Sequence, residues 1–307
     1  MTKRSVCIVV AMLCGLLPVA TSAASDTPAP TPQKAVLVTG ASTGIGRKIT
    51  ERLAAGGYFV YAGARKEADL KELGAIKNVQ AVRLDVTDSK DIAAAVEIIT
   101  KAGRGLYGLV NNAGVAISGA LTDTKEEDFD FLMQVNLYGP YRITKAFAPL
   151  IVAEKGRITT IGSISGILAP RNSGVYSMSK HAIEAFADSL AAQMAPLGVQ
   201  VSVIEPGNYN SEIGRSAAKR LGVDPRLGDR SHYKPPDEVA EAVTQALFES
   251  SPKRRYMVVP NQSEAEWTIK KAIEQLVQLN EGQAYTYDRE AMVRMLDEAL
   301  ANARPRR

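Results

Sequence analysis

Apolar runs alternate with amphipathic stretches along the chain from residue 34 onward. Each apolar run is nearly continuous, which is typical of a strand buried on both faces of a parallel sheet. A strand followed by a helix, repeated six times, predicts an α/β fold with a doubly wound parallel sheet and helices on both of its faces. The predicted strands span 35–38, 58–61, 79–84, 106–110, 157–161, 199–204 and 256–259, and the predicted helices include 46–55, 89–100, 125–152, 177–194 and 236–250.

The last part of the chain, 263–307, predicts a helical extension of the same domain. Ser263 and Glu266 have the spacing of a capping box at a helix start. Two helices are expected, over 264–279 and 288–302. Apolar side chains of the first could line a substrate pocket, form a subunit contact, or simply close the core; they are Trp267, Ile269, Ile273, Leu276 and Leu279.

The first 24 residues have the pattern of a secretory signal peptide. Lys3 and Arg4 precede an apolar run over 6–20, and small residues follow it at 21–24. The run is shorter than the roughly 18 apolar residues that a transmembrane helix needs. We expect cleavage near Ala23 or Ala24, followed by a Pro- and Thr-rich linker over 25–33. Cleavage implies a periplasmic or secreted protein; an uncleaved anchor, or a start assigned too early, would leave it membrane-anchored or cytoplasmic.

Removal of this segment changes the composition only slightly. The remaining 283 of 307 residues suit one α/β domain, predicted over 34–262. The formal net charge falls from +4 to +2 because two basic residues leave, so nothing favours nucleic acid as a partner. Cys7 and Cys14 leave as well, so the processed chain has no thiols, which is compatible with an oxidising compartment.

A glycine-rich turn joins the first predicted strand to the first helix, in the segment Thr39-Gly-Ala-Ser-Thr-Gly-Ile-Gly46. Gly40 permits a sharp turn, Gly44 lets the backbone approach a pyrophosphate, and Gly46 permits close helix packing. The helix N-terminus then faces the phosphates. A strand, this turn and a helix at the start of a doubly wound pattern predict a dinucleotide site, with Ser42, Thr43 and Ile45 in the same loop.

Tyr176 and Lys180 are four residues apart, so a helix places them on one face. A free tyrosine titrates near about 10. A fixed lysine cation should favour the ionised phenol and lower its pKa toward the range of a general acid and base. The pair therefore indicates a proton donor for an alcohol or carbonyl group.

These motifs together resemble the short-chain dehydrogenase/reductase family. The resemblance rests on Thr39-Gly-x-x-x-Gly-Ile-Gly46, Asn111-Asn-Ala-Gly114, Ser163, Tyr176-x-x-x-Lys180 and Pro206-Gly207, in the family's order and spacing. Segments 184–190 and 198–208 look most like the branch with retinol, hydroxysteroid and 3-hydroxybutyrate dehydrogenases. The resemblance implies a single-domain Rossmann fold, an NAD(P)-dependent interconversion of an alcohol with a ketone or aldehyde, and a homodimer or homotetramer.

The resemblance also implies a catalytic tetrad of Asn136, Ser163, Tyr176 and Lys180. Tyr176 would exchange the proton with the substrate oxygen, and Ser163 would hold that oxygen by a hydrogen bond. Lys180 would tune Tyr176 and bind the nicotinamide ribose. Asn136 would hold a water that links Lys180 to solvent. Ser179 is close to the tetrad in sequence, but we expect it to bond only to local backbone.

The end of the second strand indicates which cofactor is preferred. An acidic residue there would bind the ribose hydroxyls of NAD, but the chain has Arg65 and Lys66 instead. Because arginine suits bidentate phosphate contact, Arg65 is predicted to bind the 2′-phosphate of NADP, and Lys66 with Thr43 or Ser42 would assist in binding it. NADP(H) is therefore favoured, with NAD(H) possible. Other contacts that the resemblance implies are Thr39, Asp85, Val86, Asn112, Ala113, Gly114, Pro206, Gly207 and Ser211, together with Tyr176 and Lys180. The segment from Asn111 to Gly114 would line the cofactor channel after the fourth strand.

The polar stretch over 212–234 has the length and position of a substrate lid. Its sequence does not identify the small-molecule alcohol or carbonyl substrate. Two other functions are the alternatives: a non-catalytic NADP-binding redox sensor, and an epimerase or dehydratase of the same family. With only His181 and His232 as histidines, no metal site is expected.

Overall fold

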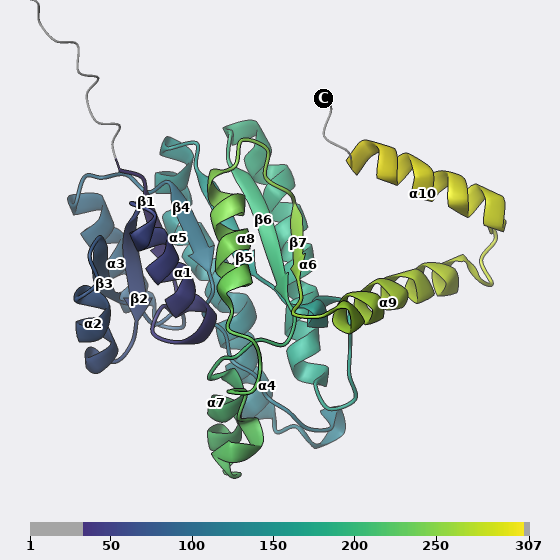
Figure 1. Cartoon of the computed structure of the whole chain (residues 1–307), viewed down its shortest axis with the longest axis horizontal. Helices are drawn as coiled ribbons and strands as arrows, with labels where there is room; N and C mark the ends of the chain where they lie inside the picture. Colours follow the sequence, from purple (N-terminus) through teal and green to yellow (C-terminus); the bar gives the residue numbers. More distant parts are fainter. Residues whose placement is uncertain (1–32, 304–307) are drawn as a thin grey trace, which may run out of the picture. The chain divides into compact units, whose positions relative to one another are not determined.

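Seven parallel strands form the centre of the protein in a computed structural model that describes residues 33–303. The strand order is β3-β2-β1-β4-β5-β6-β7, and every neighbouring pair is parallel (Figure 1). This confirms the doubly wound α/β prediction. The strands are β1 (Ala35–Val38), β2 (Phe59–Ala64), β3 (Val79–Arg83), β4 (Gly108–Asn111), β5 (Arg157–Ile161), β6 (Gln200–Pro206) and β7 (Arg255–Val258).

Helices cover both faces of the sheet. On one face lie α1 (Gly44–Ala55), α2 (Glu67–Gly74) and α8 (Asp237–Phe248), which share an apolar cluster with alternate residues of β1 and β2. On the other face lie α3 (Ser89–Lys101), α5 (Gly139–Ala153) and α6 (Gly174–Met194). The remaining helices are α4 (Glu126–Met133), α7 (Ile213–Arg220), α9 (Gln262–Asn280) and α10 (Arg289–Ala303).

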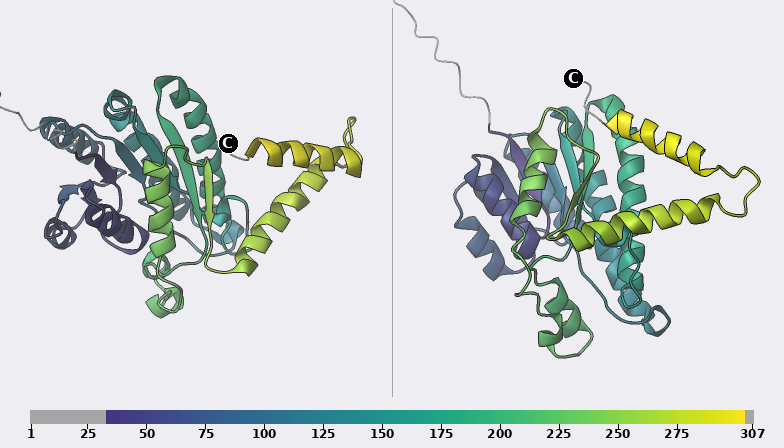
Figure 2. Two further views of the ribbon diagram at one scale, coloured as in Figure 1. Left: turned by 45° about the horizontal axis from the view of Figure 1, so that its top comes forward. Right: turned by 45° about the vertical axis from the view of Figure 1, so that its right-hand side comes forward.

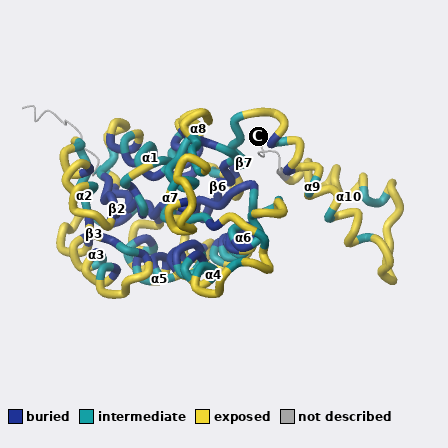
Figure 3. The backbone as a smooth tube through the Cα atoms, turned by 90° about the horizontal axis from the view of Figure 1, so that it is seen from below, coloured by how far each residue is buried: buried dark blue, intermediate teal, exposed yellow. Residues whose placement is uncertain are grey.

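The two apolar clusters explain why the strands read as continuous apolar runs. Successive residues of β1 point to opposite faces: Val36 and Val38 join the α1 cluster, while Ala35 and Leu37 join the α3 cluster. All four side chains are buried, so both faces of β1 contribute apolar side chains to the core. Figure 3 shows the sheet as the buried centre of the domain, with exposed backbone mainly in the outer turns of the helices.

Most element boundaries differ from the predicted ones by one to three residues. The helix predicted over 125–152 is divided into α4, a π-helical turn over Gln134–Tyr138 and α5. The helix predicted from residue 177 begins at Gly174, so Tyr176 lies in its first turn. Two helices were not predicted at all: α2, and α7 inside the stretch interpreted as a lid.

The C-terminal helices extend from the β7 edge of the sheet, and both views in Figure 2 show α9 running away from that edge. Asn261, not Ser263, caps α9: its side chain accepts a hydrogen bond from the Glu264 backbone N–H. The predicted capping box was therefore placed two residues late. The apolar residues of α9 do not close the core, because their exposed fractions lie between 51% and 76%; they are Trp267, Ile269, Ile273, Leu276 and Leu279.

The predicted signal peptide and most of the predicted linker lie outside the described residues. Within residues 33–303, no helix is both long and apolar enough to cross a membrane.

Candidate functional site

One large cavity lies at the carboxyl ends of the strands, beside the adjacent strands β1 and β4. The chain continues from β1 toward one half of the sheet and from β4 toward the other half. This is the topological switch point at which open α/β sheets bind ligands. The cavity has a volume of about 850 Å³, and residues from the glycine turn, the ends of β2 to β6 and α7 line it. All of the predicted cofactor residues line it except Thr39 and Asn111, and so do Ser163, Tyr176 and Lys180 of the predicted tetrad.

The glycine turn has the geometry that its sequence predicts. Gly40 and Gly44 have φ values of +64° and +55°, a region that favours glycine. A β-carbon on Gly40 would lie 2.8 Å from the Ala113 Cα atom, so the turn packs directly on the chain after β4. At Gly44 the nearest atom would be the Ser211 Cβ at 3.1 Å, which places Ser211 beside the turn.

Gly46 is required for a different contact from the predicted one. A β-carbon there would lie 2.2 Å from the Gly40 carbonyl oxygen and 2.3 Å from Asn112 Nδ2. Asn112 Nδ2 donates to the carbonyl oxygens of Thr39 and Gly40, at 2.9 and 3.1 Å. Gly46 therefore makes room for the amide that ties the turn to β4, in addition to bringing helix and strand together.

Thr39 supports the same junction from below the cavity. Its hydroxyl oxygen accepts hydrogen bonds from the backbone N–H groups of Asn112 and Ala113, both at 3.0 Å. Asn111, which we expected to line the cofactor channel, points away from it: its side chain is buried and donates to the Thr144 hydroxyl at 2.9 Å. That expectation is wrong because Asn111 is the last residue of β4 and faces α5.

The N-terminus of α1 is open toward the cavity. Thr43 caps the helix without a side-chain hydrogen bond, and the first turn contains no acidic residue. Its free N–H groups and the helix dipole suit an anionic group such as a pyrophosphate. The glycine turn and this helix end together fit a bound dinucleotide.

Arg65 and Lys66 lie beside this end of the cavity. Arg65 Nη1 is 3.6 Å from Asp85 Oδ2, and the Arg65 side chain is 60% exposed. Burial works against ionisation of Asp85, yet hydrogen bonds from Thr87 and the charge of Arg65 hold its pKa below the usual value. Asp85 thus orients a guanidinium that remains open to a ligand. Val86, the next residue, is buried under Gly139.

Asn136 lies in the π-helical turn between α4 and α5 and is buried. Its Oδ1 accepts from the Val115 N–H at 2.8 Å, and its Nδ2 donates to the Val115 carbonyl at 2.9 Å and to Ser179 Oγ at 3.1 Å. The π-turn adds one residue to the helical repeat, as such turns often do at functional sites. Both N–H donors of the Asn136 amide are used by protein atoms, so its direct effect is to hold the loop after β4 against α6.

Ser163, Tyr176 and Lys180 meet at the other end of the cavity. Ser163 follows β5; its hydroxyl donates to the Pro206 carbonyl at 3.4 Å and accepts from the Ser165 N–H at 3.0 Å. Tyr176 and Lys180 come from the first two turns of α6. Lys180 Nζ is 5.6 Å from the centre of the Tyr176 ring and donates to the Ile161 carbonyl at 2.8 Å.

The expected lowering of the Tyr176 pKa is not found. Burial raises the pKa of this phenol above its usual value, while the Ser163 hydroxyl and the charge of Arg230 act in the opposite, weaker direction. Lys180 itself is buried, and burial lowers its pKa to about 8 against the opposing charge of Glu184. The reason is that the same burial that dries the site penalises both charged forms.

The predicted lid contains structure that the sequence did not reveal. Over 212–234 it folds into α7 and a short 3-10 turn, Pro225–Gly228, and the backbones of Gly214 and Gly228 pack against each other. Arg220 anchors the end of α7 by an ion pair with Asp128 at 2.7 Å. Arg230 lines the cavity from the far end of this segment.

Sequence reasoning missed part of the role of Ser179. As expected, its hydroxyl donates to local backbone, the Tyr176 carbonyl at 2.7 Å. It also accepts from Asn136, which joins α6 to the π-turn. The fully buried Ser179 therefore connects the two predicted catalytic segments, a contact between residues 43 apart that local spacing does not indicate.

Comparison with known proteins agrees with this geometry. A sequence profile described as short chain dehydrogenase matches residues 34–221. The chain is 35% identical over 260 residues to mitochondrial D-beta-hydroxybutyrate dehydrogenase of Mus musculus, covering 73% of this chain and 76% of that protein. It is 31% identical over 232 residues to the uncharacterized oxidoreductase YbbO of Escherichia coli K12, covering 74% and 86%. The chain spans 55% and 58% of the bovine and rat D-beta-hydroxybutyrate dehydrogenases.

Solved structures show the same relationship. A short-chain dehydrogenase from Streptomyces avermitilis superposes with a TM-score of 0.70 at 29% identity, over 81% of this chain and 95% of that one. A metagenomic short-chain oxidoreductase in complex with NADP gives a TM-score of 0.61 at 28% identity, over 75% and 98%. The profile match covers the sheet up to β6, the glycine turn and the Ser163, Tyr176 and Lys180 positions. By fold, site and sequence, this chain belongs to the short chain dehydrogenase family of oxidoreductases.

Proposed function

We propose that the protein interconverts an alcohol and a ketone or aldehyde with NADP(H) as cofactor and Tyr176 as general acid and base. One observation carries the proposal: the glycine turn, Arg65 and the Ser163, Tyr176 and Lys180 side chains all line a single cavity. The mouse relatives named D-beta-hydroxybutyrate dehydrogenase and retinol dehydrogenase 5 support an alcohol or carbonyl substrate. The metagenomic relative bound to NADP supports the cofactor class.

The site residues divide the chemistry between them. A nicotinamide cofactor held in the cavity would supply or accept the hydride at the substrate carbon. In reduction, Tyr176 donates its proton to the carbonyl oxygen, and the raised pKa of the phenol keeps that proton in place until the oxygen gains charge. Ser163 donates a hydrogen bond to the same oxygen in a buried site, where it stabilises the developing charge. Lys180 lies beside the Tyr176 ring and presents an ammonium to the cofactor ribose.

The first experiment mixes the purified protein with NADPH and a panel of ketones, aldehydes, sterols and retinoids, and follows the loss of reduced-nicotinamide absorbance. We expect turnover of at least one carbonyl compound. Tight NADPH binding with no turnover across the panel, and none of the matching alcohols oxidised with NADP, would favour the non-catalytic sensor instead. No contact in the described part of the chain specifically favours an epimerase or a dehydratase.

Arg65→Ala tests the cofactor preference. Loss of the guanidinium should weaken NADPH binding about tenfold, because a charge-assisted contact on a half-exposed arginine contributes roughly 1.5 kcal/mol, and should leave NADH binding nearly unchanged. Fluorescence titration with each cofactor measures the ratio. Arg104→Ala, at an exposed arginine that packs on the Phe59 ring outside the cavity, is the control. Equal losses for both cofactors would contradict the 2′-phosphate assignment.

We further propose that the chain is exported after cleavage near Ala23 or Ala24 and acts as a homodimer or homotetramer. The charged, apolar and small-residue order over 3–24 supports export. N-terminal sequencing of the native protein after cell fractionation should find a mature start at residue 24 or 25. Full-length protein confined to the cytoplasm would refute export.

Light scattering of the purified protein measures the oligomeric state.

A further inference from the structure

Two carboxyl groups lie behind the site: Glu205, which is buried, and Glu184, whose side chain is 14% exposed. Glu184 is one helical turn after Lys180 on α6, so Tyr176, Lys180 and Glu184 follow one another along one helix face. Glu205 is on the adjacent strand β6 and is 3% exposed. Each carboxyl group affects the pKa of the other, and neither Oε1 atom has a hydrogen-bond partner in the described part of the chain. Burial of two carboxylates costs free energy unless a positive charge pairs with them.

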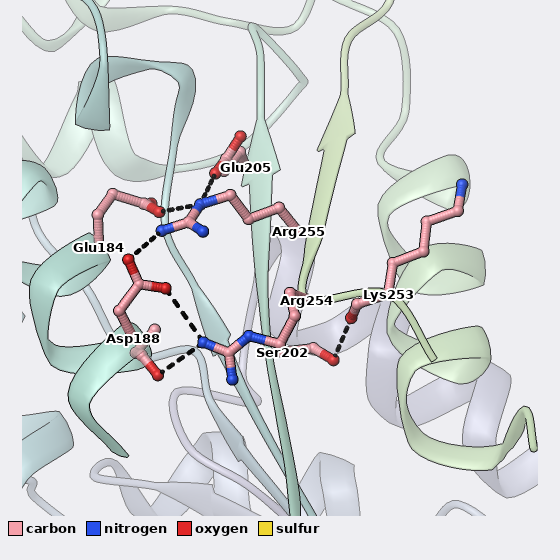
Figure 4. A network of polar contacts seen from close by, with 8 residues as sticks. Glu184, Asp188, Ser202, Glu205, Lys253, Arg254 and Arg255 are labelled. Carbon is pink, nitrogen blue, oxygen red and sulfur yellow. Dashed lines mark hydrogen bonds and ion pairs between the residues drawn. The ribbon is translucent and has the colours of Figure 1, made fainter. Parts of the chain in front are cut away.

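Two arginines bind these carboxyl groups and that of Asp188, as Figure 4 shows: Arg255, the first residue of β7, and Arg254, the residue before it. Arg255 Nε lies 3.1 Å from Glu184 Oε2 and 3.4 Å from Glu205 Oε1, and Arg255 Nη2 lies 2.7 Å from Asp188 Oδ2. Arg254 Nη2 bonds the other Asp188 oxygen at 3.1 Å. Three carboxyl groups thus face two guanidinium groups. When all three are ionised, one negative charge is left over, next to the lysine.

The loop after β5 fixes the position of Glu184. A β-carbon on Gly162 would lie 3.0 Å from Glu184 Oε1, and one on Gly166 would lie 3.1 Å from the same atom. These two glycines flank Ser163 in sequence. The carboxyl of Glu184 therefore packs directly against the loop that carries Ser163, on the side where Lys180 Nζ binds the Ile161 carbonyl.

We propose that Glu184 is a positioning residue for the reaction: its carboxylate, held by Arg255 and packed against the loop that carries Ser163, keeps the buried Lys180 ammonium charged beside Tyr176. The inference rests on the proposed function, which assigns Lys180 its role. It extends that function by a charged group that touches neither substrate nor cofactor.

The charges around Lys180 and Glu184 determine how the reaction rate should depend on pH. Burial lowers the pKa of Lys180 to about 8, and Glu184 is the charge that opposes this. Burial and the nearby Glu184 charge raise the pKa of Glu205 to about 7, so Glu205 holds a proton in acid and releases it near neutrality. Asp188, Arg254 and Arg255 face the pair from α6 and β7, and Tyr176 faces Lys180 on its other side.

Removal of the Glu184 charge leaves the burial of Lys180 unopposed, so the lysine should lose its proton at lower pH. Carbonyl reduction needs the proton on Tyr176 and the charge on Lys180, so its rate falls as pH rises through the Lys180 pKa. In Glu184→Gln this alkaline limb of kcat/KM should move down by about one pH unit, since a nearby opposite charge shifts a pKa by that order. Glu184→Asp, which keeps the charge, should restore most of the limb.

Two control variants separate charge from packing. Asp188→Asn removes a carboxylate that bonds both arginines but lies one turn further from Lys180, and it should leave the limb within about 0.3 pH units of wild type. Glu205→Gln removes a carboxylate that is ionised above neutrality but does not contribute to the Lys180 pKa, so it should also retain the limb. If both controls shift the limb as far as Glu184→Gln, or if Glu184→Gln does not shift it, the proposal is wrong.

A direct titration separates this proposal from the proposed function. Lysine side chains labelled with ¹³C are followed by NMR from pH 6 to 11, with the Lys180 signal assigned by its loss in Lys180→Arg. The Lys180 midpoint should be lower in Glu184→Gln than in wild type and unchanged in Asp188→Asn. This measurement needs no substrate, so an unchanged midpoint in Glu184→Gln overturns the inference even in an active enzyme. A lowered midpoint in a protein without turnover would leave the electrostatic link intact and refute the catalytic role.

Discussion

Tyr176→Phe should lower kcat for carbonyl reduction about a thousandfold, while NADPH binds with nearly unchanged affinity. The substitution removes one hydroxyl and keeps the ring that fills the space beside Lys180. General acid catalysis by a positioned side chain contributes roughly 10²- to 10⁴-fold to a rate, and a thousandfold corresponds to about 4 kcal/mol of activation free energy. Steady-state kinetics on an accepted substrate, with cofactor affinity measured by fluorescence, checks both parts.

The control for this variant is Tyr61→Phe. Tyr61 is also a buried tyrosine, but it lies in β2 outside the cavity, and its hydroxyl has no hydrogen-bond partner among residues 33–303. Removal of that hydroxyl should leave kcat unchanged and stability equal or slightly higher. Tyr176→Phe with wild-type turnover would contradict the mechanism, and a matching loss in Tyr61→Phe would indicate that general damage to the fold is responsible.

The sheet and the cofactor end of the site were predictable because they depend on local patterns. A strand with apolar residues on both faces needs only a run such as 35–38, and the structure has β1 over those residues. The glycine turn is equally local, since φ values at Gly40 and Gly44 follow from their places in the turn. Arg65 was found because its position relative to the end of β2 is fixed by the chain itself.

The contacts that cross the fold were not predictable in the same way. The resemblance implied a role for Asn136. Its hydrogen bonds to Val115 and Ser179, however, depend on a π-helical turn that no residue pattern predicts. The predicted lowering of the Tyr176 pKa was wrong. Spacing along a helix indicates that Tyr176 is near Lys180, but it does not indicate how deeply the phenol is buried, and burial raises its pKa. No role was predicted for Glu184, because Arg255, which pairs with it, comes from a strand 71 residues further along the chain.

These failures share a physical cause. Burial and long-range polar contacts are properties of the assembled domain, whereas periodicity and turn chemistry are properties of short segments. A lysine followed four residues later by a glutamate, as at Lys180 and Glu184, usually indicates an exposed helix pair. The burial of Lys180, and the packing of Gly162 and Gly166 against the Glu184 carboxyl, show that this pair is largely shielded from solvent.

Gly46→Ala should damage both folding and cofactor binding. The new methyl group would lie 2.2 Å from the Gly40 carbonyl oxygen and 2.3 Å from Asn112 Nδ2, so the turn or the helix has to move. Overpacking of this kind costs roughly 2 kcal/mol of unfolding free energy, which lowers Tm by about 5 °C in a domain of this size. Because the displaced atoms form the cradle for the pyrophosphate, NADPH affinity should fall roughly thirtyfold, equivalent to about 2 kcal/mol.

The matched control for Gly46→Ala is Gly74→Ala at the end of α2, where an added β-carbon meets its nearest atom, Ala81 Cβ, at an ordinary 4.0 Å. Alanine is a better helix former than glycine, so this variant should be as stable as wild type or slightly more so. Thermal unfolding and NADPH titration of both variants give the comparison. If Gly46→Ala binds NADPH like wild type, then the turn has more freedom than its packing implies, and the contact between Asn112 and the Gly40 carbonyl does not define the cofactor site.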